Sequence, residues 1–137
     1  MLKYMLDTNV CVRVLRDRPQ NIRERFNQEA RALSISSIVL FELLHGAEKS
    51  ARPVENRQAV EAFAERLSVL DFDADASAHG ANIRAELERQ GNVIGAYDTL
   101  IAGHARSRGL VVVTGNLREF TRVDGLRCED WESAAGS

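Results

Sequence analysis

The sequence contains few of the features that mark secreted, membrane or zinc-binding proteins. Its only two cysteines, Cys11 and Cys128, stand far apart and belong to no CxxC pair, which argues against a disulfide framework and against a zinc site. No apolar run approaches the roughly 20 residues that a membrane-spanning helix needs. The N-terminus also lacks the basic segment and apolar stretch of a signal peptide. We therefore expect a cytoplasmic protein with no membrane partner and two reduced, partly buried cysteines.

An excess of positive charge, the usual sign of a nucleic-acid binder, is missing as well. The formal net charge is −2, and Lys3 and Lys49 are the only lysines among 18 basic residues. Arginine binds phosphate through two parallel hydrogen bonds, but it also forms ion pairs on solvated helix faces. If the acids gather at one site, the remaining surface is net basic, which the total charge conceals. The net charge therefore does not indicate a nucleic-acid-binding protein, although it is compatible with a basic surface around an acidic site.

The composition that remains is that of one ordinary globular domain. The chain has 137 residues, of which 45% are hydrophobic and 28% charged. It contains no internal repeat, low-complexity tract or linker. We expect a single domain over residues 1–132 and a frayed tail over residues 133–137.

Short apolar strands alternate with helical patterns along the chain, which is typical of an α/β fold. The segment 110–113 is apolar throughout, as expected for a parallel strand covered on both faces. The segment 37–44 is apolar on nearly every side, which predicts a buried helix with Ser36 or Ser37 as its N-cap. The predicted strands cover residues 3–6, 33–36, 68–72, 110–113 and 125–128. The predicted helices follow Asp7 up to a break at 18–20 and then cover 22–30, 37–44, 53–67, 75–90 (ending at Gly91) and 99–107.

Four acidic or amide side chains follow strands or occupy helices in this pattern. Asp7 ends the first strand, Asn116 follows the strand 110–113, Asp98 begins a helix, and Glu42 lies inside the apolar helix. In open parallel sheets, the carboxyl ends of the strands border the ligand-binding crevice. Each acid also has a structural alternative, because Asp7 and Asp98 could cap helices and Glu42 could point to a wet edge. The sequence is compatible with both interpretations.

Several carboxylates held together favour a bound cation. They repel one another and raise each other's pKa values unless a cation neutralises them. Oxygen ligands suit Mg²⁺ or Mn²⁺, and the sequence offers no cysteine or histidine cluster as a competing metal site. His45, His79 and His104 fall within helical patterns, so we expect packing or surface positions for them. A Mg²⁺ site of this kind favours phosphoryl or phosphodiester chemistry.

Four motifs occur in order along the chain: MLDTN at the start, the glutamate in SSIVLFELLHGAEKS, IGAYDTLIAGHARSRGLVVVTGNLREF, and the closing EDW. Together they resemble the PIN-domain toxins of the VapC type. The resemblance implies an α/β/α sandwich around a central, mostly parallel five-stranded sheet, and a Mg²⁺-dependent endoribonuclease in which Mn²⁺ can substitute. It also implies a VapB-like antitoxin, a toxin homodimer, and operator DNA bound only through the toxin–antitoxin complex. The implied substrate is a structured RNA, with the anticodon stem-loop of initiator tRNA as the leading candidate.

The resemblance carries over to individual residues. Asp7, Glu42 and Asp98 match the three core acids of the family, which hold the metal. Asn116 completes the expected catalytic set, but it falls where many members have a fourth acid. An amide binds a cation without neutralising it, which puts a second metal position in doubt.

Three further residues surround this set. Thr114 matches the family's hydroxyl residue beside the site, and Asn9 is expected to support the acids or contact substrate. Glu119 could serve as a substitute ligand, but we interpret it as a solvated loop charge, as most exposed acids are.

Two other functions are compatible with the same residues. Asp7 could be the nucleophile of a Mg²⁺-dependent phosphoacceptor or phosphatase-like domain, although Asn9 stands where such domains carry a second aspartate. The acids could also belong to a non-catalytic module that only docks an antitoxin in a DNA-bound complex. For an antitoxin, we expect an amphipathic segment over the helices 54–67 and 38–44, with a basic side chain reaching the acids.

Overall fold

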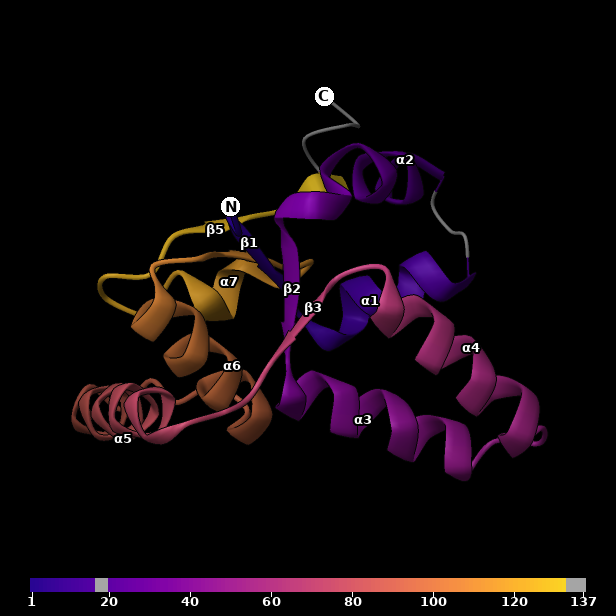
Figure 1. Ribbon diagram of the computed structural model, residues 1–137. Coiled ribbons are helices and arrows are strands. Elements are labelled where there is room, and N and C mark those ends of the chain that lie inside the picture. The colour runs from indigo at the N-terminus through magenta and orange to yellow at the C-terminus, as the bar shows by residue number, and fades with distance from the viewer. Residues whose placement is uncertain (17–19, 133–137) are drawn as a thin grey trace.

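A five-stranded parallel sheet forms the centre of the structure, a computed structural model that describes residues 1–16 and 20–132 (Figure 1). The strand order is β3-β2-β1-β4-β5, so β1 (Tyr4–Leu6) lies between β2 (Leu33–Ser36) and β4 (Val111–Val113). β3 (Ser68–Leu70) and β5 (Cys128–Glu129) form the edges. The predicted α/β class and sheet are confirmed, and every described strand pair is parallel. The predicted break at Arg18 and Pro19 and the predicted tail at 133–137 lie outside the described residues.

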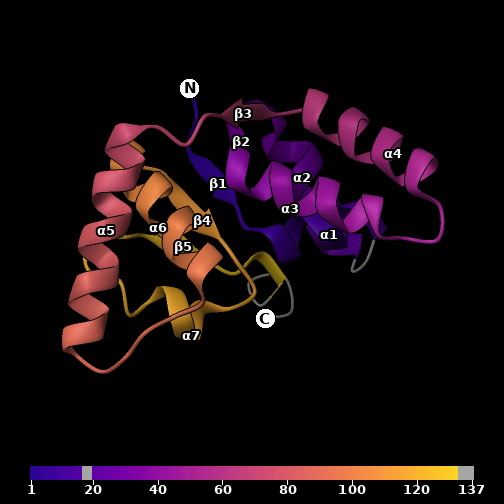
Figure 2. The same cartoon turned by 90° about the horizontal axis from the view of Figure 1, so that it is seen from below.

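Helices flank the strands in two groups, which both views show on different sides of the sheet (Figure 1 and Figure 2). No described helix is long and apolar enough to cross a membrane. A 3-10 turn, η1 (Ala30–Ala32), leads into β2, and a single helical turn, α7 (Leu117–Phe120), follows β4. One group contains α1 (Thr8–Arg16), α2 (Gln20–Glu29), α3 (Ser37–Glu48) and α4 (Pro53–Glu65), and the other contains α5 (Ala74–Arg89) and α6 (Ala96–Arg108).

The core lies on both faces of the three central strands. Every residue of β1, β2 and β4 is buried, as expected for parallel strands covered on both sides. Cys11 is buried and Cys128 is partly buried, and both are free, as predicted. The carboxyl ends of these strands therefore meet at one edge of a well-packed sheet.

α5 and α6 approach so closely that one position has room only for glycine. A Cβ built on Gly103 would lie 2.5 Å from the backbone nitrogen of Gly80 and 3.1 Å from the carbonyl oxygen of Ala76. Both neighbours are backbone atoms, so rotation of a side chain could not relieve the clash. This contact holds α6, which carries Asp98, directly against α5.

α3 is less buried than its sequence predicts. Ser36 is its N-cap, as predicted, since Ser36 Oγ accepts the backbone N–H of Ile38 at 3.1 Å. Val39 and Leu43 face the core, but the Phe41 side chain is 53% exposed. The prediction of burial on nearly every side is therefore wrong, because the neighbouring elements cover only part of the helix. Phe41 is therefore left as an exposed aromatic side chain on α3.

Several boundaries also differ from the prediction. β3 ends at Leu70 rather than at residue 72. β5 begins at Cys128 rather than at residue 125, because Gly125 has a φ of 79° and belongs to a turn. α6 begins at Ala96, three residues before its predicted start, which places Asp98 inside the first turn. The C-cap of α5 is Gln90, one residue before the predicted glycine.

Candidate active site

Asp7 lies where the central strand β1 passes into α1. Its backbone N–H donates to the carbonyl oxygen of Val113 at 3.0 Å, and its Oδ1 accepts the N–H of Val10 at 2.9 Å. The residue is only 4% exposed. Asp7 therefore does cap α1, the structural alternative that the sequence allowed. The same cap fixes its carboxylate at the carboxyl end of the sheet.

Burial raises the pKa of the Asp7 carboxyl group, and the charge of Glu42 raises it further. A hydrogen bond from Thr114, the capping N–H and the guanidinium of Arg13 act in the opposite direction. Thr114 Oγ1 accepts the backbone N–H of Asn116 at 2.8 Å, which leaves the hydroxyl proton free for Asp7. The Asp7 carboxylate is thus oriented by two donors in a place where ionisation is costly.

Glu42 projects from the second turn of α3 and is partly buried. Its Oε1 accepts the hydroxyl of Thr8 at 2.6 Å, a bond that joins α3 to the start of α1. The charge of Glu42 raises the pKa of both Asp7 and Asp98. Glu42 is therefore part of the acidic group at the end of the sheet. Sequence reasoning missed Thr8, although its place directly after Asp7 was a usable signal.

Asp98 is the third residue of α6 and does not cap it. The N-cap of α6 is Gly95, and no side chain makes the capping hydrogen bond, so the capping interpretation of Asp98 is wrong. The pKa of Asp98 is raised to about 7, most strongly by burial and further by a hydrogen bond to Glu119 and the charges of Glu119, Asp7 and Glu42. A hydrogen bond between two carboxyl groups requires a proton on one of them. The raised pKa assigns that proton to Asp98.

Glu119 belongs to the site, contrary to its interpretation as a solvated loop charge. It is partly buried in α7, and its Oε2 accepts the side-chain N–H of Asn116 at 2.9 Å. Its carboxyl group also bonds to Asp98. The sequence pattern did not predict α7, and only a helical turn brings residues three apart onto one face. Glu119 therefore places a carboxylate between the amide of Asn116 and the carboxyl group of Asp98.

The acids suit a hard divalent cation in their chemistry but not yet in their arrangement. Among the described residues, no three Asp, Glu, His or Cys side chains stand close enough together to hold a metal ion as they are placed. All the donors are oxygens, however, and the charges of their neighbours raise the pKa values of Asp7 and Asp98, as expected for uncompensated carboxylates. The proton between Asp98 and Glu119 relieves repulsion that a cation would otherwise relieve. The donor set therefore fits such a cation in its chemistry, and Asp98 would have to leave Glu119 in order to bind it.

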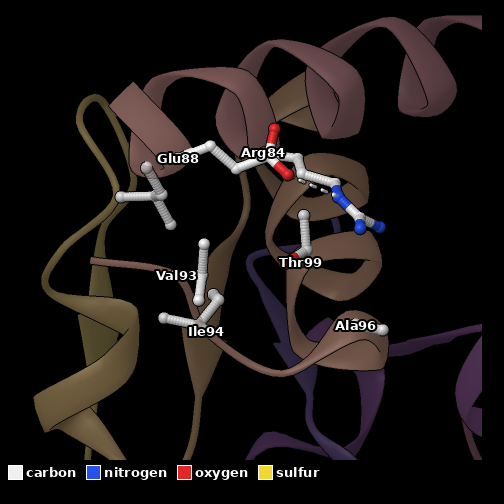
Figure 3. Close-up of a pocket in the computed structure, with 7 residues that line it drawn as sticks. Arg84, Glu88, Val93, Ile94, Ala96 and Thr99 are labelled. Carbon is white, nitrogen blue, oxygen red and sulfur yellow. Dashed lines mark hydrogen bonds and ion pairs between the residues drawn. The ribbon is translucent and has the colours of Figure 1, made fainter. Parts of the chain in front are cut away.

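One cavity borders the acidic group, and a second lies against the first turn of α6. The first, of about 370 Å³, lies between α1, α3 and α4 and has Thr8 and Glu42 in its wall. The rest of its lining is mostly apolar and includes Val12, Leu15, Leu43 and Val60. The other, of about 240 Å³, lies between α5, the loop before α6 and the first turn of α6. Figure 3 shows its lining, with Val93 and Ile94 from the loop and the Arg84–Glu88 ion pair, 3.4 Å long, from α5.

The histidines lie in packing or surface positions, as predicted. His104 is fully buried and bonds to the N-cap residue of α3 at 2.8 Å. His79 accepts a hydrogen bond from an arginine of α6 at 2.9 Å. His45 is exposed and stacks on Phe41, with the ring centroids 6.1 Å apart. Asn9 is exposed on the first turn of α1.

Known proteins resemble the chain over nearly its whole length. The PIN domain family matches residues 4–126. The chain is 57% identical over 131 residues to a tRNA(fMet)-specific endonuclease VapC of Salmonella typhimurium and 55% identical over 131 residues to the protein of that name from Shigella flexneri. Each comparison covers 96% of this chain and 99% of the relative. The crystal structure of DNA-bound VapBC from Salmonella typhimurium matches with a TM-score of 0.92 at 57% identity, covering 96% of this chain and 99% of that one.

Proposed function

The chain belongs to the PIN-domain family and, within it, to the VapC ribonucleases, and we propose that it is a Mg²⁺-dependent endoribonuclease toxin. Its proposed substrate is tRNA(fMet), which the names of two relatives specify, cut in the anticodon stem-loop in the cytoplasm. The observation that supports this function best is the group of Asp7, Glu42, Asp98 and Glu119 at the carboxyl end of a parallel sheet. Neighbouring negative charges raise the pKa values of Asp7 and Asp98, and Asp98 shares a proton with Glu119 where a cation would suit the same oxygens.

We assign the metal to Asp7 and Asp98, with Glu42 contributing directly or through a water molecule. When bound, Mg²⁺ would supply the Lewis acid that lowers the barrier to phosphodiester hydrolysis. Asp7 is oriented in advance, since a backbone N–H and Thr114 hold its carboxylate. Thr8 fixes Glu42 in the same way. Asp98, with a pKa of about 7, gives up its proton near neutral pH, and its oxygens then become available.

The surroundings of Asp7 do not favour the phosphoacceptor alternative. A nucleophilic carboxylate has to be reached in line by a phosphoryl donor, whereas Asp7 is only 4% exposed. Its carboxylate also accepts hydrogen bonds from the backbone of Val10 and from Thr114. Both features suit a fixed ligand better than an attacking group.

The proposal includes a VapB-like antitoxin and a homodimer. The cavity of about 370 Å³ between α1, α3 and α4 suits an amphipathic antitoxin segment, because it is mostly apolar and ends at Thr8 and Glu42. A basic side chain inserted there would meet the acids through charge-assisted hydrogen bonds. One related structure is named as DNA-bound VapBC, so we assign DNA binding to the toxin–antitoxin complex and not to this chain alone.

The function is tested with antitoxin-free protein, tRNA(fMet) and an elongator tRNA as the matched control. We expect cleavage of tRNA(fMet) with Mg²⁺ or Mn²⁺ and none in EDTA, leaving 5′-phosphate and 3′-hydroxyl ends. Cyclic 2′,3′-phosphate ends formed in EDTA would overturn the metal-dependent reaction. Cation-dependent cleavage of another RNA would correct the substrate only, and failure to cleave any RNA would overturn the function.

A further inference from the structure

Two exposed aromatic rings stand directly beside the acids. Phe41 is 53% exposed and precedes Glu42, and Tyr97 is 46% exposed and precedes Asp98. The two rings contact each other, with centroids 6.1 Å apart and planes tilted by 42°. Single exposed apolar residues are common on protein surfaces and need no explanation. Two large ones in contact, each adjacent in sequence to an acid of the site, do need one.

The packing of α3 against α6 explains how the rings reach this position. The two helices run in opposite directions, so Ser36 meets His104 at one end and Phe41 meets Tyr97 at the other. Consecutive helical residues are about 100° apart around the axis. Glu42 and Asp98 point toward the site. Each ring belongs to the residue before an acid, so it lies on the neighbouring face of its helix, at the rim of the site. The bond between His104 and Ser36, 2.8 Å long, keeps the helices in this register.

We propose that Phe41 and Tyr97 form a stacking platform for a nucleobase next to the bond that is cut. The inference rests on the proposed ribonuclease function and adds to it the residues that position the RNA. Bases in single-stranded loops are unstacked and bind to aromatic side chains. Stacking needs no charge, which matters here because the acids repel phosphate and the chain has a net charge of −2. His45, stacked on Phe41 with an angle of 14° between the planes, extends the platform.

A second copy of the chain is the rival occupant of these rings. A stable protein–protein interface buries about 800 Å² on each partner. Two aromatic side chains bury at most roughly 500 Å² together even when fully exposed at the start. Phe41 and Tyr97 are only about half exposed, and they border the acids rather than a broad apolar face. The observations therefore favour a base over a second subunit.

The test replaces each ring by an apolar side chain without a π face. Phe41→Leu and Tyr97→Leu should each raise KM for the initiator-tRNA anticodon stem-loop about fivefold or more, with little change in kcat. Phe41→Trp and Tyr97→Phe keep a ring and should behave like the wild type. Stacking depends weakly on ionic strength, so the loss should be the same at low and high salt, unlike the loss of a phosphate contact. Val54→Ala, at another exposed apolar residue on α4, is the matched control.

Binding is measured separately from cleavage, in an Asp98→Asn background, by the fluorescence of 2-aminopurine placed in the anticodon loop. Quenching that depends on the rings supports the platform, even if the wild type cuts no RNA and the proposed function fails. Leu variants with wild-type KM and wild-type quenching would overturn the platform. Leu variants that retain activity, together with a Phe41→Glu protein that sediments as a smaller species, would identify an interface between copies and also overturn it.

Discussion

Asp7 and Asp98 belong to one acidic group, but the chain holds them in different ways. Asp7 follows the central strand, is almost fully buried and is oriented by hydrogen bonds from Val10 and Thr114. Asp98 is half-buried in the first turn of α6, and its partner there is another carboxyl group, that of Glu119. One acid is therefore fixed by donors that stay in place, and the other by a proton that can leave.

This difference indicates how a site for a cation can be stable before the cation arrives. Donors directed at Asp7 lower the cost of a buried negative charge, which keeps one ligand in position. A proton shared by Asp98 and Glu119 leaves this pair with one negative charge instead of two. The fold therefore does not have to tolerate four close anions. In the proposed metal site, Asp7 would supply a ligand of fixed orientation, and Asp98 a ligand whose availability depends on pH.

The largest effect is expected from replacing the acids by amides. Asp7→Asn and Asp98→Asn should each lower kcat/KM by roughly 10²-fold or more, because each removes a charged group from the reacting centre. Asn caps helices as well as Asp, so Asp7→Asn should leave the free energy of unfolding nearly unchanged. Cleavage rates and urea denaturation measure the two quantities. Full activity in Asp7→Asn would show that Asp7 is only a cap.

The next largest effect is expected at Glu119, the hydrogen-bonding partner of Asp98. Glu119→Gln removes the like charge and the shared proton, so the pKa of Asp98 should fall toward its ordinary value. Carbon-13 NMR titration of the carboxyl groups measures it. Mg²⁺ affinity near neutral pH should rise, because Asp98 no longer has to lose a proton or its bond to Glu119 before its oxygens become available. Glu129→Gln, at an acid in β5, serves as the control, and an unchanged Asp98 pKa in Glu119→Gln would disprove the pairing.

Stability without metal should depend on pH through Asp98. Its pKa is about 7 in the folded chain, against an ordinary value of 3.8 for an exposed aspartate in the unfolded chain, so the folded state binds more protons between these two values. The free energy of unfolding should therefore fall as pH rises through this window. Asp98→Asn should flatten the dependence, and Mg²⁺ should restore stability above pH 7 in the wild type alone. Urea denaturation at about pH 5 and pH 8 measures this, and equal slopes for the two proteins would refute it.

The smallest effect is expected at Thr8. Thr8→Val removes the hydroxyl that bonds to Glu42 but keeps the shape of the side chain. The loss of one partly buried hydrogen bond should cost about 1 kcal/mol in unfolding free energy and a few-fold in kcat. Ser77→Ala, which removes an exposed hydroxyl bond on α5, is the control and should leave activity unchanged. A kcat in Thr8→Val equal to that of the wild type would mean that Glu42 needs no positioning by Thr8.

The sequence was informative where structure is local and less so where packing decides. Asp7 could be predicted because an apolar strand, a turn and a helix start are all encoded within ten residues. Glu119 could not, because α7 is one turn long and is held by the burial of Phe120, a contact that periodicity does not reveal. The exposure of Phe41 could not be predicted for the same reason, because it depends on which elements pack against α3. An apolar pattern shows that a helix is buried against other elements, but it does not show which elements pack against it or how much of it they cover.

The contact between Gly103 and Gly80 also has a mechanical consequence. Helices that touch through side chains can slide as rotamers change, whereas two backbones in direct contact cannot. α5 and α6 therefore behave as one rigid unit, and Asp98 keeps its position on that unit. α7 is a single turn whose backbone bonds to Asn116 are 3.2 and 3.4 Å long. If a cation were to take the place of Glu119 beside Asp98, we would therefore expect α7 to shift and α6 to keep its position against α5.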